Sequence, residues 1–197
     1  MLKVGITGGI GSGKSTVCSM LEKSGIPIFY SDKEAQTIIN NDPEVRSRIV
    51  ALLGDRAYTE SGMDRKWVGS IVFNDTEKLE GLNAIMRPAV RQSFDAWANE
   101  QDSNIVGMEA AILIESGGHK NMDHIIVVTA PMDVRIERTM KRDGCTREGV
   151  LLRIAAQMDE QEKLSYANTV ITNTGDINDL DRQVNDVCLR LKELSEI

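Results

Sequence analysis

The amino-acid sequence predicts an α/β fold, a parallel five-stranded sheet with helices on both faces. The first observation is a set of short apolar runs bounded by glycine or polar residues, the form of buried parallel strands. These runs cover residues 2–7, 26–31, 104–109, 123–130 and 169–173. The second observation is that helical patterns separate most of them, which is typical of βαβ units. The third is a glycine-rich loop directly after the first run.

The expected helices fall into two groups. Helical patterns that alternate with the strands cover residues 15–23, 32–39, 132–142, 147–158 and 176–194. Between Pro43 and Gln101 no strand is expected, and the helical patterns there cover residues 44–53, 65–73 and 76–97. We therefore expect a core of residues 1–42 and 103–197, a helical insertion at about 43–102, and a lid at about 132–158. Such an insertion would lie over the carboxyl ends of the strands, where ligands bind in open α/β sheets.

The composition excludes several classes of protein. Over 197 residues the net charge is −7, which argues against nucleic acid as the main partner, because nucleic acids select basic surfaces. No apolar run approaches the roughly 20 residues of a membrane span, and the N-terminus does not resemble a signal peptide. Cys18, Cys145 and Cys188 are too scattered for a zinc site or a disulfide framework. We expect a soluble cytoplasmic protein with reduced thiols.

The glycine-rich loop GITGGIGSGKSTV carries the strongest motif. Gly8, Gly13, Lys14 and Ser15 fit the pattern G-x-x-x-x-G-K-[ST] with no mismatch. Glycines let consecutive backbone N–H groups turn inward, and the helix that follows adds its positive pole, so the loop forms an anion site. The lysine reaches the β- and γ-phosphates, and the serine hydroxyl binds Mg²⁺. This predicts a P-loop NTPase-type fold that holds a nucleoside triphosphate through Gly9, Ile10, Gly11, Ser12, Gly13, Lys14, Ser15 and Thr16.

The rest of the sequence favours a small-molecule kinase among proteins that carry this loop. No aspartate has a glycine three residues later, and N-K-x-D is absent, so the signals of a GTPase are missing. The chain is also short for a motor or a multidomain ATPase. A non-catalytic nucleotide switch that hydrolyses ATP slowly is the alternative from another class.

Polar residues end three of the strand candidates. Asp32 follows the second one and is either the base that accepts the proton of an attacking hydroxyl or part of a helix cap. Glu109 ends the third and is either an acid that orders magnesium-bound water or a surface residue. Asn173 ends the fifth, where a nucleotide base would lie, or is simply part of the turn before the next helix. The pattern alone leaves each choice open.

Arg135, Arg138 and Arg142 are spaced to lie on one face of a helix. Arginines that close over the phosphates would neutralise the charge that builds on the transferring group. The alternative is a solvated face on which the arginines pair with nearby acidic residues, and charge runs are usually of that kind. A turn between Gly144 and Gly149 would serve as the hinge of such a lid.

The sequence resembles the dephospho-coenzyme A kinase family over nearly its whole length. The similarity runs through GITGGIGSGKSTV, GIPIFYSD, WVGSIVF, LNAIMRP, ERTMKRDGCTREGV, RIAAQM and VITNTGD. The resemblance implies that ATP, with Mg²⁺, phosphorylates the ribose 3′-hydroxyl of dephospho-coenzyme A to give coenzyme A. It further implies that Asp32 is the catalytic base, that Arg138 and Arg142 face the phosphates, and that Asn173 lies near the adenine. The helical insertion would then be the acceptor side of the enzyme.

The sequence departs from the family pattern on the acceptor side. Tyr30 stands where the family often has an additional aspartate, and Arg87 stands at the histidine position of LNAIMRP. A Pro-Leu-Leu segment of the family is here Ala111-Ile112-Leu113, although Glu115 is kept. Arg87 is expected to be an anion contact for the acceptor, or else a surface residue at a helix turn before Pro88. Tyr30 is expected to be an acceptor contact that differs from the family's, or else to mark a position where the aspartate is dispensable. Another small hydroxyl compound, such as a nucleoside or sugar, is the alternative acceptor. Mg²⁺ would be bound by Ser15, and through water by Asp32 or Glu109.

Overall fold

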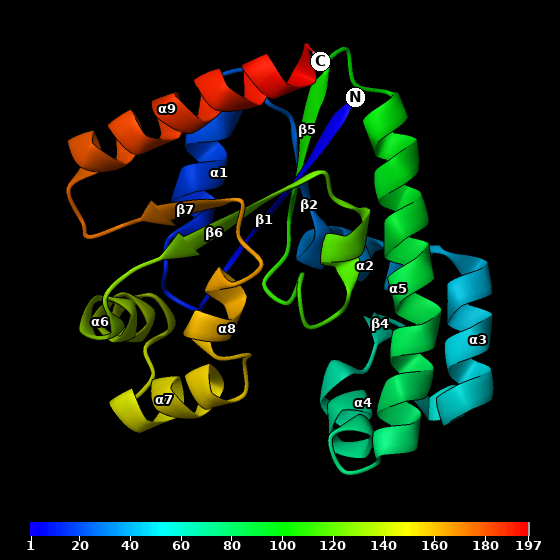
Figure 1. Ribbon diagram of the computed structural model, residues 1–197. Coiled ribbons are helices and arrows are strands. Elements are labelled where there is room, and N and C mark those ends of the chain that lie inside the picture. The colour runs from blue at the N-terminus through cyan, green and yellow to red at the C-terminus, as the bar shows by residue number, and fades with distance from the viewer. Residues whose placement is uncertain (197) are drawn as a thin grey trace. The chain divides into compact units, whose positions relative to one another are not determined.

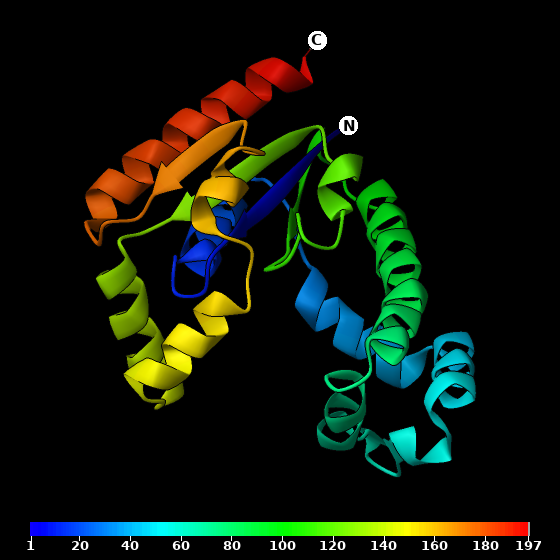
Figure 2. The same ribbon diagram turned by 60° about the horizontal axis from the view of Figure 1, so that its bottom comes forward.

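The computed structural model describes residues 1–196, which divide into two compact units. The first unit joins Met1–Tyr30 to the chain from Glu100 onward, and the second is Ser31–Asn99. Each unit has its own hydrophobic core. Figure 1 and Figure 2 show the elements of each unit from two directions. Across residues 1–196, no helix combines the length and the apolarity needed to cross a membrane.

The first unit is built on the parallel five-stranded sheet that the sequence predicts. Its strand order is β2-β5-β1-β6-β7, and every pairing is parallel. The strands are β1 (Leu2–Gly8), β2 (Ile28–Tyr30), β5 (Ile105–Glu109), β6 (His124–Thr129) and β7 (Thr169–Thr172). Because β1 is the central strand, the glycine loop leaves the sheet from the middle of its carboxyl edge, where ligands bind in this class of fold.

Helices cover both faces of this sheet. On one face α1 (Lys14–Lys23) and α9 (Ile177–Ser195) pack against the strands, and their apolar side chains share one core with them. On the other face α8 (Glu160–Leu164) packs against β6, on the side of the sheet away from α9 (Figure 2). The short helix η2 (Gly118–Asn121) lies in the connection from β5 to β6. The predicted fold class is confirmed.

The expected lid region contains two helices, α6 (Met132–Asp143) and α7 (Arg147–Ala155). The second of these ends three residues before the predicted boundary at residue 158. A separate short helix, α8, then begins because the Asp159 carboxylate accepts hydrogen bonds from the N–H groups of Gln161 and Glu162. The sequence does not predict α8, since five residues are too few to display a helical period.

The second unit is mainly helical and has a small hairpin. Its helices are α2 (Ser31–Asn41), α3 (Pro43–Leu53), α4 (Arg65–Val72) and α5 (Thr76–Asn99), with the short helix η1 (Asp55–Ala57). Their apolar sides meet in a core that includes Ile38, Ile49, Val68 and Ile85. The expectation of no strand in this stretch was wrong in one place, because β3 (Tyr58–Thr59) and β4 (Gly62–Met63) pair antiparallel. Two-residue strands have no alternation for a sequence pattern to detect.

Helix α2 belongs to this second unit, whereas the sequence assigned residues up to 42 to the core. It packs on α3 and α5, so its apolar side is buried within the helical unit. The Tyr58 hydroxyl donates to the carbonyl oxygen of Ile39 at 2.8 Å, and the Met63 N–H donates to Asn40 Oδ1 at 3.0 Å. The unit boundary therefore falls directly after β2, at Ser31.

Candidate active site

The glycine loop connects β1 to α1 through backbone that only glycine adopts readily. Gly11 has φ 76° and Gly13 has φ 95°, both in the left-handed region that side chains disfavour. There is also no room for a side chain at either position. A Cβ atom at Gly11 would overlap the carbonyl oxygen of Arg135, and one at Gly13 would overlap the side-chain amide of Asn173. The loop therefore packs directly on α6 and on the end of β7.

Lys14 begins α1 and its side chain folds back along the loop. Its Nζ donates to the carbonyl oxygen of Gly8 at 3.0 Å and to that of Gly9 at 3.3 Å. Ser15 and Thr16 follow it and are exposed. Within the described residues no side chain caps α1, whose first turn opens on the loop. A helix start of this kind binds anions through its N–H groups and its dipole.

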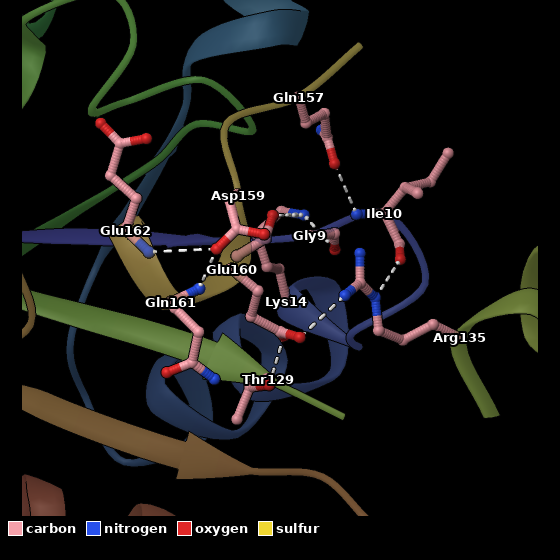
Figure 3. A network of polar contacts seen from close by, with 11 residues as sticks. Gly9, Ile10, Lys14, Thr129, Arg135, Gln157, Asp159, Glu160, Gln161 and Glu162 are labelled. Carbon is pink, nitrogen blue, oxygen red and sulfur yellow. Dashed lines mark hydrogen bonds and ion pairs between the residues drawn. The ribbon is translucent and has the colours of Figure 1, made fainter. Parts of the chain in front are cut away.

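Ile10 is held at both polar groups of its backbone (Figure 3). Its N–H donates to Oε1 of Gln157 at 3.0 Å, and its carbonyl oxygen accepts from Nε of Arg135 at 3.0 Å. The Arg135 side chain is buried, and its NH1 group donates to Oε2 of Glu160 at 3.1 Å. Residues of α6 and of the segment around the start of α8 thus fix the conformation of the loop.

Arg138 and Asn173 meet at the far end of the loop. The NH2 group of Arg138 donates to Oδ1 of Asn173 at 3.0 Å, and its NH1 group donates to the Asn173 carbonyl oxygen at 3.3 Å. Nδ2 of Asn173 in turn donates to the carbonyl oxygen of Ser12 at 3.0 Å. The structure therefore brings together an arginine of α6, a strand-end amide and the glycine loop, three features that the sequence indicates separately.

Arg142 is placed differently from the other two arginines of α6. All three lie on the one helix α6 at the expected spacing, but Arg135 is buried, Arg138 is half-buried and Arg142 is exposed in the last turn. Nε and NH2 of Arg142 bind the Asp143 carboxylate at 2.7 and 3.1 Å, and Arg153 binds it at 2.7 Å. The hydrogen bond from Arg142, with smaller help from Arg153, lowers the pKa of Asp143 to about 2. Arg142 thus belongs to an ion cluster at the junction of α6 and α7.

Glu109 and Tyr30 end neighbouring strands at the carboxyl edge of the sheet. Glu109 lies in register with Ile6 of β1 and with Tyr30 of β2. The Tyr30 hydroxyl donates to Oε2 of Glu22 at 3.1 Å, and burial together with this hydrogen bond raises the pKa of Tyr30. Glu109 is therefore beside the strand that leads into the glycine loop, and Tyr30 is one strand further out.

Asp32 and Arg87 belong to the second unit. Asp32 is exposed. It is the second residue of α2, which begins at Ser31 immediately after β2 ends at Tyr30. Both Ser31 and Asp32 lie inside the first turn of this helix rather than at the cap position that the alternative required. Arg87 is exposed on α5 and precedes Pro88, which lies inside the helix.

Sequence reasoning gave no role to Gln157, Glu160 or Thr129. The Thr129 hydroxyl, at the end of β6, donates a hydrogen bond to Oε1 of Glu160 (Figure 3). Gln157 lies in the run RIAAQM, whose family resemblance was the one available signal for it. Glu160 lies in a five-residue helix, and its partners are far away in the sequence, so no spacing pattern could identify it.

A parallel sheet with a phosphate-binding loop after its central strand, and with α6 arginines against that loop, defines a nucleotide-binding protein of the P-loop kinase class. Shikimate kinase from Acinetobacter baumannii shares this fold, with a TM-score of 0.57 at 15% identity over 98% of this chain and 94% of that one. Within the class, this chain belongs to the dephospho-CoA kinase family, whose sequence model matches residues 2–179.

Individual relatives agree with this family membership. Dephospho-CoA kinase from Bacteroides fragilis is 38% identical over 176 residues, covering 89% of this chain and 86% of the relative. The same enzyme from Thermus thermophilus is 36% identical over 190 residues, covering 95% and 91%. A crystal structure of a Thermus thermophilus protein superposes with a TM-score of 0.85 at 35% identity, over 96% of this chain and 97% of that one. The similarity therefore covers both units.

Proposed function

We propose that this protein transfers the γ-phosphoryl group of ATP to the ribose 3′-hydroxyl of dephospho-coenzyme A, giving coenzyme A. The observation that carries the proposal is the family match to residues 2–179, because it includes the helical unit as well as the nucleotide-binding unit. Kinases of other small acceptors share only the fold with this chain. Another hydroxyl acceptor, or a nucleotide switch without catalysis, is therefore not favoured.

On the nucleotide side, the glycine loop would hold the phosphates of ATP through its backbone N–H groups. Lys14 would exchange the carbonyl oxygens of Gly8 and Gly9 for the β- and γ-phosphates, which carry more negative charge. Arg138 lies at the loop through Asn173 and would stabilise the charge of the transferring group. Arg142 can contribute in the same way only by leaving Asp143.

On the acceptor side, Asp32 would accept the proton of the attacking hydroxyl and orient its oxygen. It stands two residues after Tyr30 in the chain, at the junction between the two units. We assign Arg87 of the helical unit as an anion contact for the acceptor, and Tyr30, at the end of β2 in the first unit, as a neighbour of the hydroxyl. The lid would comprise α6 and α7, which carry Arg138 and Arg142.

The residues of the loop fit the Mg²⁺ ion that this reaction requires. Within residues 1–196 no three histidine, cysteine or acidic side chains gather as a ligand set. Mg²⁺ bound with a nucleotide takes most of its ligands from phosphates and water, and needs one or two from the protein. The exposed hydroxyl of Ser15 would supply one, with Asp32 or Glu109 acting through water. The ion would neutralise phosphate charge during transfer.

The experiment that tests this function is ADP release from Mg-ATP with and without dephospho-coenzyme A, with the product weighed by mass spectrometry. We expect release that depends on the acceptor, and a product heavier by one phosphoryl group. Release at the same slow rate with and without the acceptor would reject this acceptor and turn attention to Tyr30 and Arg87. The cytoplasmic location expected from the sequence stays a prediction.

A further inference from the structure

Arg135 is a buried cation, and its surroundings show what it does for the loop. Its side chain is 3% exposed, and a buried guanidinium is strongly unfavourable unless it is both neutralised and hydrogen-bonded. Glu160 supplies the opposite charge at 3.1 Å, and the carbonyl oxygen of Ile10 accepts from Nε at 3.0 Å. The guanidinium also occupies the space that a side chain at position 9 would need, so Gly9 packs directly against it.

Gln157 holds the other polar group of the same residue. Its Oε1 accepts from the Ile10 N–H at 3.0 Å, so neither the N–H nor the carbonyl oxygen of Ile10 depends on water or on a ligand for its partner. We call Arg135, Gln157 and Glu160 the loop clamp (Figure 3). The three residues come from α6 and from the segment around the start of α8, and they all act on one residue of the phosphate-binding loop.

The clamp is itself hydrogen-bonded to other parts of the first unit. Glu160 accepts the hydroxyl hydrogen of Thr129 at the end of β6. The Met158 N–H, next to Gln157, donates to Oε1 of Glu115 at 3.3 Å. Asp159 caps α8 and thereby fixes the direction of its first turn. A segment tied to the rest of the unit at Met158 and Glu160, and capped between them by Asp159, can hold a loop in one conformation with little loss of entropy on binding.

We propose that Glu160 and Gln157 are positioning residues for the phosphate-binding loop, Gln157 directly and Glu160 through Arg135. They keep the N–H and the carbonyl oxygen of Ile10 hydrogen-bonded within the protein. The N–H groups that follow Ile10 in the loop are then held in the conformation that binds the phosphates of ATP. The inference rests on the proposed function only in that the loop binds ATP. Because the clamp acts on the loop alone, it affects nucleotide binding and leaves acceptor binding unchanged.

The test compares ATP binding by calorimetry, without acceptor, for the wild type, Glu160→Ala, Glu160→Gln and Gln157→Leu. We expect Glu160→Ala and Gln157→Leu to raise the Kd of ATP about tenfold, which corresponds to about 1.4 kcal/mol. Glu160→Gln keeps one acceptor oxygen, for Arg135, and its amide N–H can donate to the Thr129 hydroxyl, so it loses the charge but not the shape and its Kd should rise by less. In turnover, the KM for ATP should follow the Kd while kcat stays within about threefold of the wild type.

The control is Lys78→Gln, which removes an exposed ion pair between Lys78 and Asp75, at 3.2 Å, in the second unit, which contains neither the loop nor the lid. Its ATP affinity should match the wild type. A purely structural role for Glu160 would weaken ATP and dephospho-coenzyme A binding equally, or would lower only the melting temperature. Either pattern, or an unchanged ATP Kd in both Glu160→Gln and Gln157→Leu, overturns the proposal. If Glu160→Ala does not fold, these two milder variants decide.

The results distinguish a failure of the loop clamp from a failure of the proposed kinase function. A wild type that binds ATP but makes no coenzyme A would reject the function and still allow the clamp to be measured. A wild type with normal turnover and clamp variants of normal ATP affinity would reject the clamp alone. A wild type that binds no ATP would reject both.

Discussion

The side chain of Asn173 donates a hydrogen bond to the main-chain oxygen of Ser12, which lies 161 residues earlier, at 3.0 Å. The same side chain accepts from Arg138 at 3.0 Å and is 6% exposed. One amide therefore joins the end of β7, the glycine loop and α6. It also explains why position 13 must be glycine, since a Cβ there would overlap the Asn173 amide.

We expect Asn173→Ala to weaken ATP binding about tenfold. The substitution leaves the Ser12 carbonyl oxygen without this donor and frees Arg138 to move, and an unsatisfied buried polar group costs about 1–3 kcal/mol. Calorimetric titration with ATP measures the effect. Asn185→Ala is the control, because Asn185 is exposed on α9 and donates to Asp181 at 3.1 Å. Equal ATP affinity in both variants would contradict the role assigned to Asn173.

The fold could be predicted from the sequence because its signals are local. Each of the five strands is a short apolar run, and the glycine loop fixes which strand carries the ligand site. The β3–β4 hairpin and α8 were missed because two-residue strands and a five-residue helix show no period. Helix α2 was predicted, but its membership of the second unit depends on packing against α3 and α5, which no local pattern encodes.

The site could be predicted only in part, for a physical reason. The loop residues Gly8 to Ser15 form a continuous motif, so their spacing identifies them. Arg135 and Arg142 are equally basic in sequence, yet one is buried against Ile10 and the other is exposed beside Asp143. Which arginine faces the loop depends on partners such as Glu160, far along the chain, so helical spacing could not separate them.

Lys163→Met should destabilise the fold by about 3 kcal/mol, because removing one member of a buried ion pair leaves the other charge uncompensated. Lys163 is 1% exposed, and its Nζ lies 2.7 Å from Oε1 of Glu115. The same oxygen also accepts a hydrogen bond from the Met158 N–H at 3.3 Å. Urea unfolding followed by circular dichroism measures the change. Adding Glu115→Gln should restore part of the stability, since it removes the stranded charge.

The control for this prediction is Arg182→Met on α9. Arg182 pairs with Asp179 in the same helix, and the Arg182 side chain is mostly exposed. Exposed pairs of this kind contribute little because water screens them, so the unfolding midpoint should not change measurably. A loss of stability as large as that of Lys163→Met would show that burial of the Lys163–Glu115 pair is not the cause.

Thiol labelling should distinguish the three free cysteines. Cys18 and Cys188 are buried, whereas Cys145 is partly exposed. Burial, with a smaller contribution from Glu109, raises the pKa of Cys18 to about 12. Because the thiolate is the reactive form, a raised pKa keeps Cys18 protonated and unreactive at pH 8, and reactivity should rise only as the pH approaches 12.

We therefore expect maleimide at pH 8 to label the native chain once, at Cys145, and the unfolded chain at all three cysteines. Intact-mass spectrometry counts the labels, and Cys145→Ser should abolish the native one. Rapid labelling of Cys18 in the native chain at pH 8 would contradict the packing of α1 on the sheet, where Cys18 is fully buried.

Asp32→Asn tests the proposed role of Asp32 as the base of the phosphoryl transfer. Asparagine has nearly the same shape as aspartate but does not accept a proton, so kcat should fall on the order of a hundredfold while the Kd of ATP stays unchanged. Asp32 is exposed in the first turn of α2, so the substitution should leave the fold intact and a loss of kcat would reflect the chemistry. Glu60→Gln, at the exposed turn of the β3–β4 hairpin, removes the same charge from the same unit and should keep normal turnover. Turnover of Asp32→Asn close to that of the wild type would remove Asp32 from the mechanism and leave phosphate stabilisation by Lys14 and Arg138 as the main chemistry of the site.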